Sequence, residues 1–127
     1  AETITARRQE TWNHYYQAFS KLESSGRLRR PVIPAECEQN AHMYYLLLRD
    51  ADDRLQFIST MKAKEIDCVF HYVPLHSSPF ARKLASPLSS LNRTSNLSER
   101  LVRLPLWVNI GEYLPLVIES SQECLLR

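Results

Sequence analysis

The sequence predicts an α+β domain, in which a small sheet of about three strands is flanked by helices and preceded by a long N-terminal helix. Three patterns support this prediction. Apolar residues recur at helical spacing near the start, a strand–helix–strand pattern follows, and a further strand and helix complete the chain. The 127 residues suit one domain, because domains usually contain about 100–150 residues.

The first predicted helix covers residues 3–24. Its apolar stripe is rich in aromatic side chains, and Gly26 supplies a stop signal after it. The stripe consists of Ile4, Trp12, Tyr15, Tyr16, Phe19 and Leu22. Such a stripe is typical of a packing face, although its aromatic content also allows contact with something outside this chain.

The middle of the chain is predicted to contain two strands joined by a helix. Residues 41–48 are rich in strand formers and apolar on both alternations, which is typical of a strand buried on both faces. Residues 66–73 form the second predicted strand, which Pro74 ends. A helix between two strands makes a crossover, so the strands should run parallel, either as neighbours or with a third strand between them.

The connecting helix is predicted to begin at Asp50 or Asp52 and to end near Lys64. An aspartate at a helix start accepts hydrogen bonds from the free amide groups of the first turn. Helical spacing places three apolar side chains inward, namely Leu55, Ile58 and Met61.

The last third of the chain is predicted to begin with a long surface loop over residues 77–97, because seven of the 22 residues from Ser77 to Ser98 are serine. Loops of that length in compact domains are usually functional or poorly ordered. A short helical turn is expected at 98–103 and the third strand at 104–108. The final helix should start near Gly111, with Pro115 in the first turn, where amide hydrogens lack helical partners.

Composition excludes several classes of function. The chain has only two glycines, Gly26 and Gly111, whereas a phosphate-cradling loop needs several close together. The net charge of +2 does not favour nucleic acid as a partner, and the basic stretch at 27–30 is predicted to be a solvated loop. The longest apolar run, residues 44–48, is far shorter than the roughly 20 residues of a membrane span.

Cysteine usage indicates a reducing compartment. Cys37, Cys68 and Cys124 contain no CxxC pair, and one of them stays unpaired in any disulfide scheme, so we expect reduced thiols and a cytoplasmic protein. No signal peptide is recognisable, and the sequence begins with Ala1 rather than Met. This start suggests a processed or excised piece.

The one polar and aromatic cluster, His71-Tyr72-Val73-Pro74-Leu75-His76, lies where a predicted strand meets the predicted loop. Sites are often built at such strand ends, and both histidine and tyrosine can form hydrogen bonds to a ligand. The alternative is a structural histidine and a core tyrosine. Strict alternation would place His71 and Tyr72 on opposite faces, so they can share a pocket only if the strand breaks before Pro74.

Nucleophilic and metal chemistry find little support. The chain contains no Gly-x-Ser-x-Gly or Cys/His signature. The side chains that could hold zinc lack ligand spacing, namely His42, His71, His76, Cys37 and Cys68. We therefore expect no metal site.

Three ordered segments resemble the C-terminal domain of the DegT/DnrJ/EryC1/StrS sugar aminotransferases. They are Gln39-Asn40-Ala41-His42-Met43-Tyr44-Tyr45, Val69-Phe70-His71-Tyr72-Val73-Pro74-Leu75-His76, and Ser98-Glu99-Arg100-Leu101-Val102-Arg103-Leu104-Pro105-Leu106-Trp107. The similarity extends over nearly the whole chain. It implies a C-terminal small domain of a fold-type I, pyridoxal-phosphate-dependent enzyme, with residues 1–25 as a linking helix and 31–127 as the sheet-and-helix domain.

The resemblance also implies the reaction. Such enzymes transfer an amino group from glutamate to a dTDP-linked 4-keto-6-deoxy sugar for surface polysaccharides, usually as homodimers. Their Schiff-base lysine belongs to a large domain and lies in a Ser-aromatic-x-x-Lys loop. The lysines here are Lys21, Lys62, Lys64 and Lys83, and only Ser59-Thr60-Met61-Lys62 has even the bare spacing. We therefore expect no catalytic or cofactor-binding residue in this chain, no bound pyridoxal phosphate and no activity of the chain alone.

By resemblance, the domain closes over the cofactor and helps to form the sugar-nucleotide pocket, with Tyr72, His71 and His76 as substrate contacts. One departure concerns residues 80–95, which are shorter and richer in serine than the family's stretch and lack a tyrosine after Arg93. A different class remains open, a free-standing interaction or dimerisation module that uses the aromatic helix. An arginine-rich nucleic-acid binder is disfavoured by the charge balance.

Overall fold

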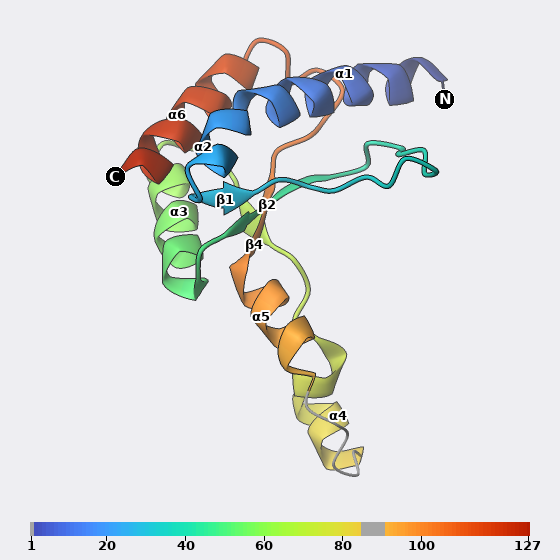
Figure 1. Cartoon of the computed structure of the whole chain (residues 1–127), viewed down its shortest axis with the longest axis vertical. Helices are drawn as coiled ribbons and strands as arrows, with labels where there is room; N and C mark the ends of the chain where they lie inside the picture. Colours follow the sequence, from blue (N-terminus) through green and yellow to red (C-terminus); the bar gives the residue numbers. More distant parts are fainter. Residues whose placement is uncertain (1, 85–90) are drawn as a thin grey trace.

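The computed structural model describes residues 2–84 and 91–127 and confirms the predicted α+β class (Figure 1). Within these residues, helices pack against one small antiparallel sheet of four strands. In chain order the elements are α1 (Glu2–Ala18), α2 (Ser20–Ser24), β1 (Leu28–Arg29), β2 (Tyr44–Leu48), α3 (Ala51–Ala63), β3 (Val69–Phe70), a 3-10 turn (Leu75–Ser77), α4 (Pro79–Leu84), α5 (Asn92–Arg100), β4 (Leu101–Leu104) and α6 (Leu114–Leu126).

The strand order is β1-β2-β4-β3, and each strand is antiparallel to its neighbours. Because β4 pairs with both β2 and β3, those two strands run parallel with a third between them. This arrangement confirms the predicted crossover, in the form in which a third strand lies between the two parallel strands. The second predicted strand is shorter than expected, since only residues 69–70 of 66–73 pair in the sheet.

One face of the sheet carries the hydrophobic core. Tyr44 pairs with Leu104 and Leu46 with Val102, and all four side chains are buried against the helices. The aromatic stripe of α1 and α2 contributes Trp12, Tyr15, Phe19 and Leu22 to this same core. Ring contacts of Trp12, Tyr15 and Phe19 with Tyr44, at centroid distances of 5.0–6.3 Å, join helix and sheet. The stripe is therefore a packing face within the chain, apart from Ile4, which is exposed.

The opposite face of the sheet is far less covered. Alternation and register place six side chains on it: Arg29, Tyr45, Leu47, Val69, Leu101 and Arg103. Leu47 alone of these is buried, and the others are half-buried or exposed. We call this surface the open sheet face.

The last pairing strand lies at 101–104 instead of 104–108, and the helix before it extends over 92–100 instead of forming a turn at 98–103. Val102 and Leu104 point into the core while Leu101 and Arg103 point away, which is the alternation of a half-buried strand. Pro105 has no amide hydrogen for a ladder bond, so the strand ends before it.

The prediction of a loop over residues 77–97 is wrong, because most of the residues of this range that the structure describes are helical. Helix α4 occupies 79–84 and α5 begins at Asn92, whereas residues 85–90 of that predicted loop lie outside the described residues. In Figure 1 the helices α4 and α5 project together away from the sheet. We call residues 71–84 and 91–100 the arm, and residues 2–70 and 101–127 the body.

Two smaller expectations are also corrected. Residues 28–29 of the predicted solvated loop pair with β2 as an edge strand. On α3, Met61 is buried and Ile58 packs against the core, but Leu55 is exposed and Phe57 takes the inward position. The predicted cap is present, because the Asp50 carboxylate accepts a hydrogen bond of 2.8 Å from the Asp53 amide.

Two helices end in the same backbone motif. After α2, the amides of Gly26 and Arg27 donate to the carbonyls of Glu23 and Leu22, and Gly26 has a φ of 74°. After α3, Glu65 and Ile66 donate to Lys62 and Met61, and Glu65 has a φ of 61°. Both are Schellman caps, which favour glycine at the left-handed position.

Helix α6 starts at Leu114, with Pro115 in its first turn as predicted. None of the helices in the described residues is both long and apolar enough to cross a membrane.

Candidate functional site

The sequence-predicted residues His71 and Tyr72 lie at the junction of body and arm, directly after β3. The strand ends at Phe70, so alternation no longer separates the two side chains. Their ring centroids lie 4.7 Å apart in an edge-to-face arrangement, and Tyr72 is 75% exposed. The structure therefore brings these two residues together and presents the tyrosine to solvent.

His71 sits in a positively charged and partly dry environment. Its Nδ1 is buried without a hydrogen-bond partner among the described residues. Burial lowers the pKa of His71, and the nearby Arg103 and His42 lower that pKa further. The imidazole is consequently neutral near pH 7, when it can still donate or accept one hydrogen bond.

Arg103 joins this pair from the open sheet face. Its guanidinium carbon lies 6.0 Å from the centroid of the Tyr72 ring, and its Nε is buried without a partner in the described part of the chain. Sequence reasoning did not single out this arginine, because it was placed in a helical turn. A strand ending at Pro105 was the available signal for its true position.

His76 occupies a different place from the other two predicted residues. Its Nε2 lies 3.0 Å from the Ser95 hydroxyl oxygen, so it joins the 3-10 turn to α5 within the arm. Ser77 and Ser98 make further bonds there, donating to the carbonyls of Pro74 and Ser95. His76 therefore has a structural contact in this arrangement.

A pocket of about 490 Å³ opens where the arm leaves the body. Helix α3 supplies Arg54, the chain around β3 supplies Phe70 and Tyr72, and α5 supplies Ser98 and Glu99. The volume lies within the range of about 300–1,000 Å³ that is usual for small-molecule sites. Sequence reasoning found Tyr72 but missed Arg54, because nothing in the pattern of α3 shows which element its polar side faces.

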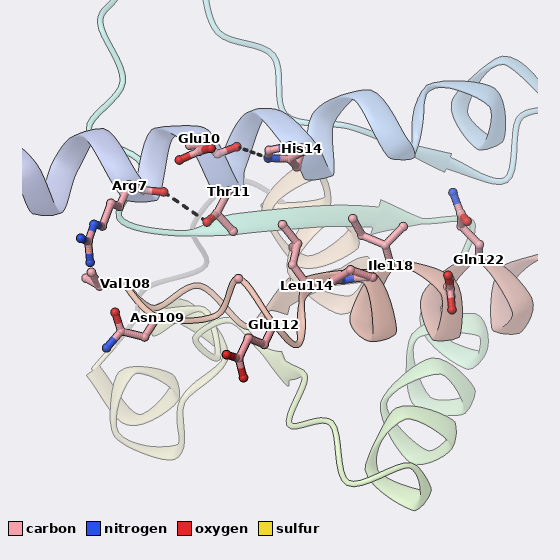
Figure 2. A pocket seen from close by; sticks show the side chains of 13 residues that line it. Arg7, Glu10, Thr11, His14, Val108, Asn109, Glu112, Leu114, Ile118 and Gln122 are labelled. Atoms are coloured by element: carbon pink, nitrogen blue, oxygen red, sulfur yellow. Dashed lines mark hydrogen bonds between the residues drawn. The ribbon is translucent and has the colours of Figure 1, made fainter.

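A larger and more open groove of about 980 Å³ runs between α1 and the start of α6 (Figure 2). It contains none of the predicted site residues. Two of the polar side chains of α1 that line it are bonded within the helix, since Thr11 donates to the Arg7 carbonyl and His14 contacts the Glu10 carbonyl. Carboxylates and basic side chains are mixed along it, so it selects no particular ligand charge.

The four lysines of the chain lie on helices or at a helix end. Lys21, Lys62 and Lys83 are exposed on α2, α3 and α4. The Nζ of Lys64 forms an ion pair of 2.7 Å with Glu123. Lys64 also lines a pocket of about 590 Å³ beside Asp67 and Trp107, where the ion pair with Glu123 occupies its Nζ.

Metal ligands are also dispersed. Within the described ranges, no three His, Cys, Asp or Glu side chains gather around one point. All three cysteines are free thiols; Cys37 is exposed, and burial raises the pKa of Cys68 to about 12. A buried thiol with such a pKa is unreactive near neutrality.

Several solved structures superpose closely on this chain, and one of them is an aminotransferase, TlmJ. DesV of S. venezuelae, solved in complex with a ketimine intermediate, superposes with a TM-score of 0.85 at 24% identity over 99% of this chain. TlmJ of Streptoalloteichus hindustanus superposes with a TM-score of 0.82 at 23% sequence identity over 97% of this chain. NtdA of Bacillus subtilis, solved with bound cofactor PMP, superposes with a TM-score of 0.81 at 14% sequence identity over 98% of this chain. This chain covers 33%, 32% and 29% of those three chains, respectively.

Sequence comparison points the same way. The uncharacterized protein MJ1066 of Methanocaldococcus jannaschii is 35% identical over 86 residues, which are 65% of this chain and 22% of that protein. The chain thus spans less than a quarter of its archaeal relative and about a third of the solved enzymes. Residues 1–118 match the family model, and the chain belongs to the DegT/DnrJ/EryC1/StrS aminotransferase family.

Proposed function

We propose that this chain is the C-terminal small domain of a pyridoxal-phosphate-dependent sugar aminotransferase. The observation that carries the proposal is that nearly the whole of this chain superposes on about a third of the length of TlmJ and of DesV. The lysine arrangement is consistent with it, because three of the four lysines are exposed on helices and the fourth is paired with Glu123. In this proposal the small domain closes over the cofactor, which binds to the large domain.

The junction of body and arm is the part that meets the substrate in this proposal. Tyr72 projects into solvent from an edge-to-face contact with His71, whose imidazole is neutral near pH 7. These two residues are the proposed substrate contacts. His76 has a supporting role through its bond to Ser95, and it reaches substrate only if that bond opens.

We propose a dTDP-linked 4-keto-6-deoxy sugar as substrate and glutamate as amino donor. The three motif segments resemble those of dTDP-4-amino-4,6-dideoxygalactose transaminase, which serves enterobacterial common antigen and other surface polysaccharides. The proposed enzyme is a cytoplasmic homodimer. This part of the proposal rests on sequence resemblance, whereas the domain assignment also rests on the fold.

The direct test assays the complete enzyme that contains this chain, with pyridoxal phosphate, glutamate and a panel of dTDP-4-keto-6-deoxy sugars. We expect 2-oxoglutarate and one amino sugar, and a tenfold or greater fall in kcat/KM for Tyr72→Ala, of the order expected when a substrate contact is removed. Amination of free sugars alone, or of no sugar, would refute the substrate assignment.

The chain by itself provides a second measurement. Added pyridoxal phosphate is expected to give no Schiff-base absorbance band beyond that of a lysine-containing control protein. A band that disappears in Lys62→Ala would contradict the expected inactivity of this domain, because it would place a cofactor lysine on α3.

A further inference from the structure

The pocket that contains Lys64 lies at the end of the sheet that is remote from the arm. Val69 pairs with Arg103 in antiparallel register, so residues 66–68 lead towards Pro105 and away from the arm. The pocket is lined at this start of β3, whereas the pocket at the junction of body and arm lies where β3 ends. The two pockets share no lining residue, so a ligand in one does not contact the other. We call the pocket beside Lys64 the remote pocket.

The floor of the remote pocket is apolar. Ile66 and Val117 line it and are buried, while Leu116 on α6 lines it with half of its surface exposed. The volume of about 590 Å³ lies within the range of about 300–1,000 Å³ that is usual for small-molecule sites. A ligand with an apolar part can therefore remove water from this floor.

Two aromatic side chains of the remote pocket stand partly in solvent. Trp107 is 45% exposed and Tyr113 is 56% exposed. Among the described residues, neither ring contacts another aromatic ring, and no arginine or lysine lies over either ring. The face of an aromatic ring carries negative potential and attracts a cation, and tryptophan does so most strongly.

The charges around these rings also favour a cation. Glu65 and Asp67 line the pocket, and neither carboxylate forms an ion pair in the part of the chain that the structure describes. Lys64 lines it too, but its Nζ lies 2.7 Å from the Glu123 carboxylate and 3.4 Å from the Ser120 hydroxyl oxygen. The lysine charge is thus compensated, while two carboxylates remain uncompensated beside two aromatic rings.

An organic ammonium ion matches this combination of an apolar floor, aromatic rings and carboxylates. We propose that the remote pocket binds a small molecule with an alkylammonium group, with Trp107 and Tyr113 in contact with the cationic head and Asp67 supplying the opposite charge. An inorganic cation does not fit, because it needs several ligands around one point, and no three His, Cys, Asp or Glu side chains gather in the described ranges.

This binding site is separate from the proposed function. It uses no residue of the junction of body and arm, no cofactor and no sugar substrate. Failure of the aminotransferase assay would therefore leave the remote pocket untouched, and failure of the binding test below would leave the domain assignment untouched.

The test is an NMR titration of the isotope-labelled chain with choline and with neohexyl alcohol. The alcohol has a carbon atom in place of the choline nitrogen, so it keeps the shape and lacks the charge. Choline should shift the indole signal of Trp107 and the amide signals of Ile66 and Tyr113, while the indole signal of Trp12, which is 5% exposed in the core, should stay in place. The alcohol should bind about tenfold more weakly, because it gains no cation–π or charge interaction.

Three variants separate the contributions. Trp107→Leu keeps an apolar side chain and removes the ring, so it should weaken choline binding about fivefold and change the affinity for the alcohol by less than about twofold. Asp67→Asn should weaken choline binding about threefold and leave the alcohol unaffected. Asp52→Asn is the matched control, because Asp52 is an exposed aspartate in the first turn of α3 that does not line the pocket, and it should change neither affinity.

Several results would overturn the proposal. They are the absence of any shift with millimolar choline, equal binding of choline and the alcohol, or variants of Trp107 and Asp67 that both behave like Asp52→Asn. A shift of the same signals when the chain alone is diluted would place a second copy in the pocket, and would also overturn it. The dispersion of the amide spectrum shows whether each variant is folded, and Tyr113→Leu repeats the ring test at the other aromatic position.

Discussion

The body and the arm of this chain are built on different principles. The body contains all the buried side chains of the described residues, most of them in the core on the helix-covered side of the sheet. The described arm contains none, and it exposes Tyr72, Val73, Leu75, Phe80 and Leu91. The difference indicates that the body supplies stability, while the arm presents apolar surface that a partner domain or ligand can cover.

Few polar contacts hold the arm to the body. The Arg100 Nε donates a 2.7 Å hydrogen bond to the Leu48 carbonyl, and Arg54 reaches the Ser98 carbonyl. Each such bond contributes about 1 kcal/mol or somewhat more with a charged donor. Substitutions in the two regions should therefore have separable effects, on folding in one case and on binding in the other.

The largest expected effect comes from a matched pair of phenylalanines. Phe57 in the body is 1% exposed and Phe80 in the arm is 70% exposed. Phe57→Ala should lower the free energy of unfolding by about 3–5 kcal/mol, because it leaves a cavity in a packed core. Phe80→Ala should change it by less than about 0.5 kcal/mol. Urea denaturation measures both, and equal losses would abolish the distinction between the regions.

The two Schellman caps of the body provide the next test. Gly26→Ala should cost about 1–2 kcal/mol, because its φ of 74° is unfavourable for a residue with a Cβ. The cost is conformational, since no atom lies within 4 Å of the added Cβ. Glu65→Gly should raise the free energy of unfolding by up to about 1 kcal/mol, and with it the melting temperature, because glycine relieves the same strain at a φ of 61°. A lower melting temperature for Glu65→Gly would show that its side chain makes a stabilising contact.

Within the arm, His76→Ala should remove the 3.0 Å contact to Ser95. The loss of about 1 kcal/mol should appear as faster hydrogen exchange or proteolysis at residues 75–77 and 92–100, with the urea midpoint of the body unchanged. An unaltered exchange rate in the arm, or a shifted midpoint, would indicate that the arm and the body unfold together.

The smallest effect concerns pH at the boundary of the two regions. His71 has a pKa below its ordinary value of 6.5 in the folded chain, so the unfolded chain takes up the proton first as pH falls. Folded stability is therefore lost as pH falls through about 6.5 towards the lowered pKa. His71→Asn should reduce the difference in unfolding free energy between about pH 7.5 and about pH 5.5. An unchanged difference would assign that pH dependence to other groups.

The sequence predicts the body well because its signals are periodic. Helical spacing of apolar residues predicts α1 and α3, and Asp50 predicts the cap at the start of α3. The crossover rule predicts that β2 and β3 run parallel. Strand β1 has only two residues and therefore no period to detect. The prediction fails for the arm because α4 and α5 are short, with six and nine residues, and the serines of α5 and of the segments around both helices favour a loop.

The candidate site was predictable in part. His71 and Tyr72 stand out as a polar and aromatic pair at a strand end, and the structure places them in contact. Arg54 belongs to a helix well separated in sequence, and its place in the pocket follows from the packing of α3 against α5. The spacing of residues along one helix does not show which distant element its side chains contact.

The position of β4 has a consequence for the order in which the chain can fold. This strand is the last in sequence but lies between β2 and β3, so neither of its neighbours can complete its pairing until residue 104 has left the ribosome. The whole arm lies between β3 and β4 in sequence and forms the loop that this pairing closes. Closing it costs chain entropy, and the short helices of the arm shorten the effective loop. The helical structure of the arm should therefore also affect how fast the sheet forms.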